Sequence, residues 1–152
     1  MAFEAEHAQE RYRGTDSDRF ITDPLTGRLL ECRGQGTAVL KPSKDHVFIA
    51  FDIHNTPLYL REEMVVAFQG NLKWESGWLR SKSHRLGMLS FRGRGKIFIQ
   101  LSGSLFNLEL PDEEFLLTPM EKLIGWEGYV VAQCNQGELV HAAGSGNLFL
   151  RN

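Results

Sequence analysis

Short apolar stretches separated by turn residues dominate the chain from Phe20 onward. These stretches alternate with Gly, Asn, Asp and Pro, a rhythm that is typical of strands and turns rather than helices. The best internal candidate for a helix, residues 119–126, contains Gly125 and is better explained as a turn followed by a strand. The pattern therefore predicts an all-β fold with no long helix after residue 18.

Three segments alternate apolar and polar side chains with the two-residue period of a strand that is buried on one face. They are residues 71–75, 96–101 and 105–110, and in the last of these Phe106, Leu108 and Leu110 share one face. A shift by one residue would bury the polar positions, so the register of these strands is well specified. Residues 47–51 are apolar on both faces, which predicts a central strand that is covered on both sides.

A glycine motif occurs three times along the chain. Residues 34–40, 93–99 and 144–150 each consist of Gly-x-Gly, one polar residue and three apolar residues. A dinucleotide-binding loop would need a third glycine and a following helix, and neither is present, so a phosphate site is disfavoured. We expect the glycines to supply positive φ at a turn or bulge where a strand begins. These structural glycines are Gly34, Gly36, Gly93, Gly95, Gly144 and Gly146.

A longer internal similarity extends the glycine repeat. Residues 48–70 align with residues 106–128 when one extra residue is allowed in the later copy. We therefore predict one domain over residues 19–152, made of two pseudo-repeats at about 34–92 and 93–152. The polar residues 1–18 are expected to form a flexible N-terminal arm. The last strand, residues 148–150, has no following partner in its own repeat, so we expect it to close the first repeat or to join a neighbour's sheet.

The aligned segments resemble the AIM24 family, which is related to the TRAP-like β domains. The carrying residues are Gly93–Gln100 with Ser104–Leu110, and Phe115–Pro119 with Leu123–Gly128; Val47–Asp52 with Leu58–Arg61 looks like a looser copy. The resemblance spans about residues 34–150. It implies a rolled β-sandwich, or short double-stranded β-helix, with a cupin-like shape. Members of this family have no established catalytic residues and tend to be discussed as organisational or interaction proteins, whereas more distant tryptophan-responsive relatives bind RNA.

Composition is that of an ordinary globular protein. Of the 152 residues, 42% are hydrophobic and 24% are charged, and the formal net charge of −2 gives no global attraction to nucleic acid or an anionic membrane. We see no transmembrane segment and no signal-peptide pattern, so a cytoplasmic location is expected. Cys32 and Cys134 are expected to be reduced, partly buried thiols.

Candidate catalytic groups are scattered along the sequence. A metal-dependent cupin needs closely spaced histidines with a downstream glutamate, and no two of the five histidines, His7, His46, His54, His84 and His141, are close in sequence. Neither cysteine has a histidine nearby in sequence. We therefore expect no catalytic residue, no metal and no cofactor, and we predict that the protein is not an enzyme. A metal-dependent cupin-like enzyme is the least favoured alternative.

A basic stretch beside two tryptophans is the one charge pattern that suggests a surface. The candidate interaction residues are Trp74, Trp78, Arg80, Lys82, Arg85, Arg92, Arg94 and Lys96. Basic residues near aromatic rings are typical of RNA or single-strand binding. A basic edge that faces the acidic turn 112–114 of another subunit suits the negative net charge better.

The sequence thus favours a non-catalytic interaction or scaffold protein that acts through assembly with itself or with a partner protein. RNA or small-ligand binding through residues 80–96 is the alternative.

Overall fold

The computed structural model describes residues 7–10, 30–81, 84–111, 114–135 and 137–152. The described residues form antiparallel strands and two single 3-10 turns, which confirms the all-β prediction. Of the predicted arm over residues 1–18, the structure describes residues 7–10. These form β1 (His7–Glu10), which pairs with β2 (Leu30–Arg33).

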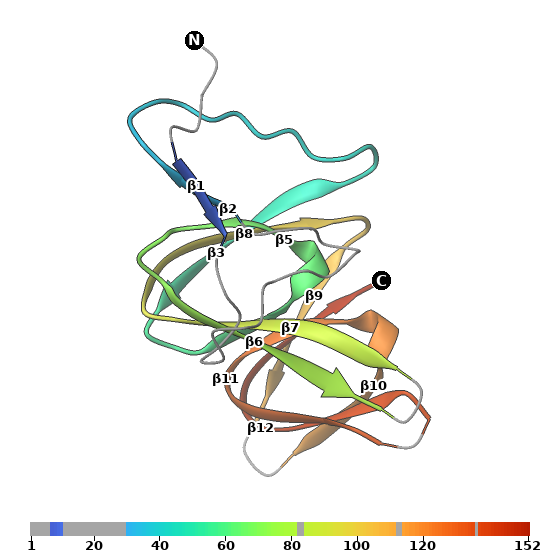
Figure 1. Cartoon of the computed structure of the whole chain (residues 1–152). Coiled ribbons are helices and arrows are strands. Elements are labelled where there is room, and N and C mark those ends of the chain that lie inside the picture. The colour runs from blue at the N-terminus through green and yellow to red at the C-terminus, as the bar shows by residue number, and fades with distance from the viewer. Residues whose placement is uncertain (1–6, 11–29, 82–83, 112–113, 136) are drawn as a thin grey trace.

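Two units follow each other along the chain. The first contains β3 (Val47–His54), β4 (Leu58–Arg61), the turn η1 (Glu62–Met64), β5 (Val65–Phe68), β6 (Lys73–Arg80), β7 (Arg85–Arg92) and β8 (Arg94–Leu101). The second contains β9 (Leu105–Leu110), β10 (Phe115–Pro119), the turn η2 (Met120–Lys122), β11 (Leu123–Cys134) and β12 (Leu139–Arg151). Figure 1 shows the first unit from cyan to yellow and the second from orange to red.

The strand pairing of the first unit recurs in the second. In the first unit, β8 pairs with β3 and β5, while β7 pairs with β4 and β6. In the second unit, the C-terminal half of β12 pairs with β9 and the start of β11, while its N-terminal half pairs with β10 and the end of β11. Thus the single strand β12 corresponds to β7 and β8 together, and β11 corresponds to β5 and β6 together. Both units are rolled sheets built on one plan. They divide between β8 and β9, not at the expected boundary between residues 92 and 93, because β8 pairs with β3 and β5 of the first unit.

Two of the three glycine motifs do not lie where a strand begins. Gly93, with a φ of 109°, separates β7 from β8, as expected. Its counterpart Gly144, with a φ of 115°, lies inside the unbroken strand β12. Residues 37–43, after Gly34 and Gly36, form no strand, and Val39 is 88% exposed. The prediction failed there because three apolar residues alone do not make a strand without a partner edge to pair with.

A shared wall joins the two units. It consists of β9, the start of β11 and the end of β12. Neighbouring residues on it are buried on opposite faces: Leu123 and Leu148 belong to the core of the second unit, and Ile124 and Phe149 to the core of the first. Phe149 meets Phe51 of β3 edge-on, with ring centroids 5.0 Å apart.

This wall corrects the expectation for residues 148–150. Leu148 pairs with Trp126 on one side and with Leu108 on the other, so the strand is fully partnered inside its own unit. It neither closes the first repeat by pairing nor needs a neighbour's sheet edge. The sequence pattern suggested an unpaired strand because no strand follows residues 148–150, whereas the partners of Leu148 lie earlier in the chain.

Two other strands also differ from the sequence prediction. Residues 47–51 belong to β3, an edge of the three-stranded sheet β3-β8-β5, and Val47 is 53% exposed. The apolar outer positions of β3 therefore do not mark a central strand. The ladder does place Phe106 and Leu108 on the face of β9 that Leu150 and Leu148 share, but they lie at the open side of the second roll and are 49% and 41% exposed.

A buried arginine fastens β4 to the start of β11, where the two units meet edge to edge. Arg61 Nη1 donates to the carbonyl oxygens of Glu121 and Leu123 at 3.1 and 3.4 Å, and Nη2 forms an ion pair with Glu63 Oε1 at 2.8 Å. Burial lowers the pKa of this guanidinium, and the neighbouring Glu63 carboxylate opposes that shift. The guanidinium thus satisfies two backbone carbonyls of the other unit.

We predict that Gly144→Ala destabilises the domain, whereas Gly77→Ala does not. A Cβ at position 144 would lie 2.2 Å from the backbone oxygen of Tyr129, and the φ of 115° is strained for any other residue. We expect a loss of at least about 2 kcal/mol in the free energy of unfolding. Gly77, in β6, has open space around its Cβ position, so Gly77→Ala should stay within about 0.5 kcal/mol of the parent. Urea denaturation measures both, and equal midpoints for the two variants would contradict the close-packing argument.

Candidate interaction surface

Three strands of the second unit present an apolar face to solvent. Across β10, β12 and β11 the ladder aligns Phe115 with Ala143 and Val131, and it aligns Leu117 with His141 and Gln133. Tyr129 is the next outward residue on β11 and pairs with Ser145. The alternate positions, including Val140 and Ala142, are fully buried in the second core. Because side chains alternate along a strand, the first set must point outward.

We call this surface the outer apolar face and define it by Phe115, Leu117, Tyr129 and Val131. These side chains are 61%, 48%, 80% and 60% exposed. The Phe115 ring stacks on His141, with centroids 4.9 Å apart and an interplanar angle of 26°. None of the eight ladder positions on this face carries a charged side chain. Grouped apolar side chains of this kind are typical of a protein-interaction site.

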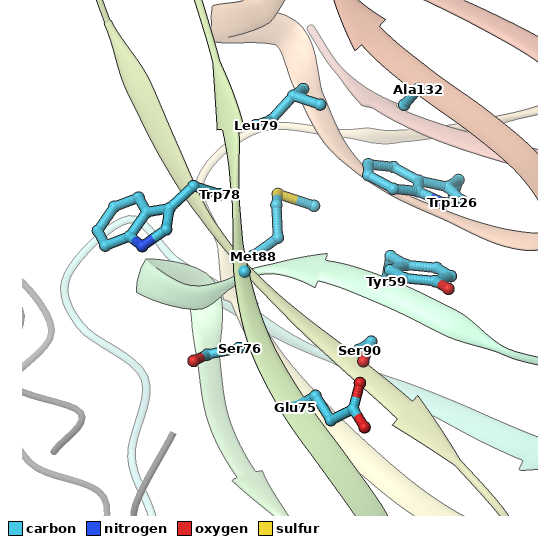
Figure 2. A pocket seen from close by; sticks show the side chains of 10 residues that line it. Tyr59, Glu75, Ser76, Trp78, Leu79, Met88, Ser90, Trp126 and Ala132 are labelled. Atoms are coloured by element: carbon cyan, nitrogen blue, oxygen red, sulfur yellow. The ribbon is translucent and has the colours of Figure 1, made fainter. Parts of the chain in front are cut away.

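A small pocket lies between the units (Figure 2). Tyr59 of β4 and Trp126 of β11 stack with centroids 4.9 Å apart and form one wall. Met88 of β7 points toward this pair, whereas Trp78 points the opposite way. The volume is about 280 Å³, near the lower end for ligand pockets. Glu75 and Ser90 supply polar groups, so the pocket could hold a small, partly apolar molecule.

The basic residues expected to form a surface are distributed over different parts of the fold. Arg80 pairs with Arg85 at one end of the β6–β7 hairpin, and the Arg85 guanidinium lies 4.7 Å from the Trp78 ring. Arg92 lies at the other end of β7, roughly 24 Å away at about 3.4 Å per residue.

The remaining residues of that set have other surroundings. Arg94 and Lys96 lie on β8, where Lys96 forms an ion pair with Asp52 at 3.0 Å. Trp74 packs against Phe68 at the first core. Lys82 lies outside the described residues, as do Asp112 and Glu113 of the predicted acidic partner turn. The structure therefore divides these residues between the two ends of the β6–β7 hairpin rather than gathering them into one patch. Trp78, Arg80 and Arg85 lie at one end, and Trp74, Arg92 and Arg94 lie near the other. Their role in binding stays a prediction.

The residues of the outer apolar face were not singled out from the sequence. A signal existed: Tyr129, Val130 and Val131 are consecutive apolar residues in one strand. Such a run is normally taken as a strand that is buried on both faces. Only the fold shows that one face is open.

The groups that could carry chemistry have separate surroundings. His46 Nδ1 contacts the carbonyl oxygen of Lys44, His84 pairs with Glu138, and His141 stacks on Phe115. Among the residues with a described placement, no three His, Cys, Asp or Glu side chains lie close enough together to hold a metal ion. Cys134 is a free, half-buried thiol, and burial raises its pKa. A raised pKa leaves less thiolate, the opposite of what a nucleophile requires.

Comparison with known proteins gives a family and a fold. The family model described as "Mitochondrial biogenesis AIM24" matches residues 15–151. The crystal structure of protein SPYM3_0169 from Streptococcus pyogenes matches with a TM-score of 0.59 and 13% sequence identity, over 70% of this chain and 54% of that one. At this identity the likeness shows the fold alone, and the present chain spans about half of that protein. No curated protein matches the sequence. In the described part of the chain, no helix is long and apolar enough to cross a membrane.

We predict that Cys134 reacts slowly with thiol reagents. Because burial raises the pKa of this thiol, its thiolate fraction at pH 8 should be below that of an unfolded cysteine. In a Cys32→Ser background, the rate of modification by a disulfide reagent should be several-fold lower than for a peptide of residues 130–138. The pH at half-maximal rate should also be higher than for the peptide. A rate equal to or above that of the peptide would refute the prediction, and the further change Cys134→Ser assigns the signal.

Proposed function

This chain belongs to the AIM24 family, and from that premise we propose that it is a non-catalytic interaction protein that works through assembly. The observation that carries the proposal is the outer apolar face. Its two aromatic rings alone expose roughly 280 Å² if each side chain offers about 200 Å². Burying this apolar surface against a partner removes it from water, which favours association.

The chemistry of the accessible groups supports a non-catalytic role. The Cys134 thiol has a raised pKa, and the His141 ring is stacked on Phe115 in the middle of the apolar face. Both side chains are better suited to packing than to proton transfer or nucleophilic attack. We infer that Cys134 contributes to packing of the second core and that His141 contributes to the outer apolar face.

Small-ligand binding is a second candidate, favoured by the pocket beside Tyr59 and Trp126. Its stacked aromatic wall and polar mouth have the composition of a ligand site. RNA binding through residues 80–96 has weaker support. Its basic side chains are divided between the two ends of β7, and Lys96 on β8 is paired with Asp52.

A cytoplasmic location remains our proposal for the chain. The description of the family refers to mitochondrial biogenesis. If the native host has organelles, its fractionation into cytosol and organelles tests the location directly.

We predict that the double substitution Phe115→Ser, Tyr129→Ser abolishes assembly. Both side chains are largely exposed, so the fold should persist while the apolar contact is lost. Tagged protein expressed in the native host is cross-linked, and the retained chains, including untagged copies of the protein itself, are quantified by mass spectrometry. We expect at least a tenfold loss of the specifically retained chains, about 1.4 kcal/mol or more.

The matched control is Val66→Ser, which changes an exposed valine, 36% exposed, on β5 of the other unit. It should retain the same chains as the parent. Circular dichroism and melting curves verify that all variants are folded. If the double variant retains the same set as the parent, the outer apolar face is not the interaction site and the proposal fails.

A further inference from the structure

We propose that the occupant of the outer apolar face is a second copy of this chain, packed face to face across a two-fold axis. This inference rests on the proposed function and names the partner of the same surface. Three observations carry it: the use of the equivalent face in the first unit, a steric block against head-to-tail pairing, and the neutrality of the face.

The first observation comes from the duplicated plan. The ladders make Leu116 and Ala142 of the second unit equivalent to Leu58 and Phe91 of the first. Leu117 is therefore the counterpart of Tyr59. In the first unit, the face that carries Tyr59 and Met88 is covered, because both pack against the second core.

The repeat thus already uses this face to stack on another rolled unit. In the second unit the same face carries Leu117 and Phe115 and is open. Stacked repeats normally end in a polar face that keeps the end soluble. An apolar end therefore continues the stacking contact that joins the two units.

The second observation concerns how a second copy can approach. A head-to-tail contact would repeat the β4–β11 junction by pairing β10 of one copy with β5 of the next. In that junction the backbone oxygen of Tyr59 lies 1.9 Å from where a Cβ on Gly125 would be. Gly125 pairs with Phe149 in the second unit, and Ala67 pairs with Phe98 at the equivalent position of the first unit. Ala67 is therefore the counterpart of Gly125 and carries a Cβ where the junction requires glycine.

The Ala67 methyl group therefore blocks an identical junction at β5. A heterologous contact of that kind would also propagate into a ring or fibre, whereas a two-fold contact closes on itself. A two-fold arrangement, in which each copy covers the other, needs no such junction at β5.

The third observation is electrostatic. In a two-fold contact each residue of the face meets a residue of the same face on the other copy, and residues beside the axis meet their own counterparts. A face with charges of one sign would therefore repel its copy. The eight ladder positions of the face hold no Asp, Glu, Lys or Arg; they are Phe115, Ala143, Val131, Leu117, His141, Gln133, Tyr129 and Ser145. Two copies of one sheet segment also have the same twist and can stack about 10 Å apart with aligned strands. The face is therefore compatible with itself.

The test uses opposite charges at one exposed position. Val131 is 60% exposed, so Val131→Glu and Val131→Lys should fold normally. Each variant alone brings two uncompensated charges of the same sign into the apolar contact, whereas an equimolar mixture brings in opposite charges that attract each other. Val66→Glu is the matched control on the other unit. Sedimentation velocity at high micromolar concentration reports the mass, and circular dichroism reports the fold.

We expect the parent chain and Val66→Glu to be dimers, both single variants to dimerise at least tenfold more weakly, and the mixture to regain the dimer. A monomeric parent chain overturns the inference. So does a dimer that persists in both single variants, because the contact then lies elsewhere, for example at the β10 edge.

The two proposals can fail separately. If the parent is a monomer but cross-linking in the host still retains other proteins through Phe115 and Tyr129, the partner is a different protein and the proposed function stands. If neither self-association nor retention depends on this face, both proposals fall.

Discussion

The shared wall between the two rolled units is the interaction on which the rest of the structure depends. Leu123 and Leu148 fill one core while their neighbours Ile124 and Phe149 fill the other. A strand can do this only if both of its faces are covered, so neither roll can open without exposing the other. The wall therefore belongs to both cores and joins the two rolled units.

The wall also explains where the chain needs glycine. At Gly125, Gly144 and Gly146, backbone oxygens of other strands occupy the space that a side chain would take. These close approaches bend β11 and β12 so that each strand serves both layers of the second roll. Gly144 and Gly146 of the repeated motif therefore allow β12 to bend close to β11, which explains why they lie inside a continuous strand.

Stacking one unit on the other leaves the two ends of the molecule unequal. The face of the first unit that carries Tyr59 and Met88 is covered by the second, whereas the corresponding face of the second unit carries exposed Phe115 and Tyr129. The sheet face that this stacking leaves uncovered, on β10, β12 and β11, is the one available to a partner.

The sequence by itself determined the strand content, the presence of an internal repeat and the family, because alternation, turn residues and repeated glycines are local patterns along the chain. It did not determine where the units divide, because that depends on the pairing of β8 with β3 and β5. It could not determine which apolar faces are covered. Val47, Phe106 and Tyr129 have the composition of buried strand residues, yet each is largely exposed. Only the tertiary structure decided this, because burial depends on which distant strand lies above a face. The same long-range pairing gave Leu148 partners earlier in the chain.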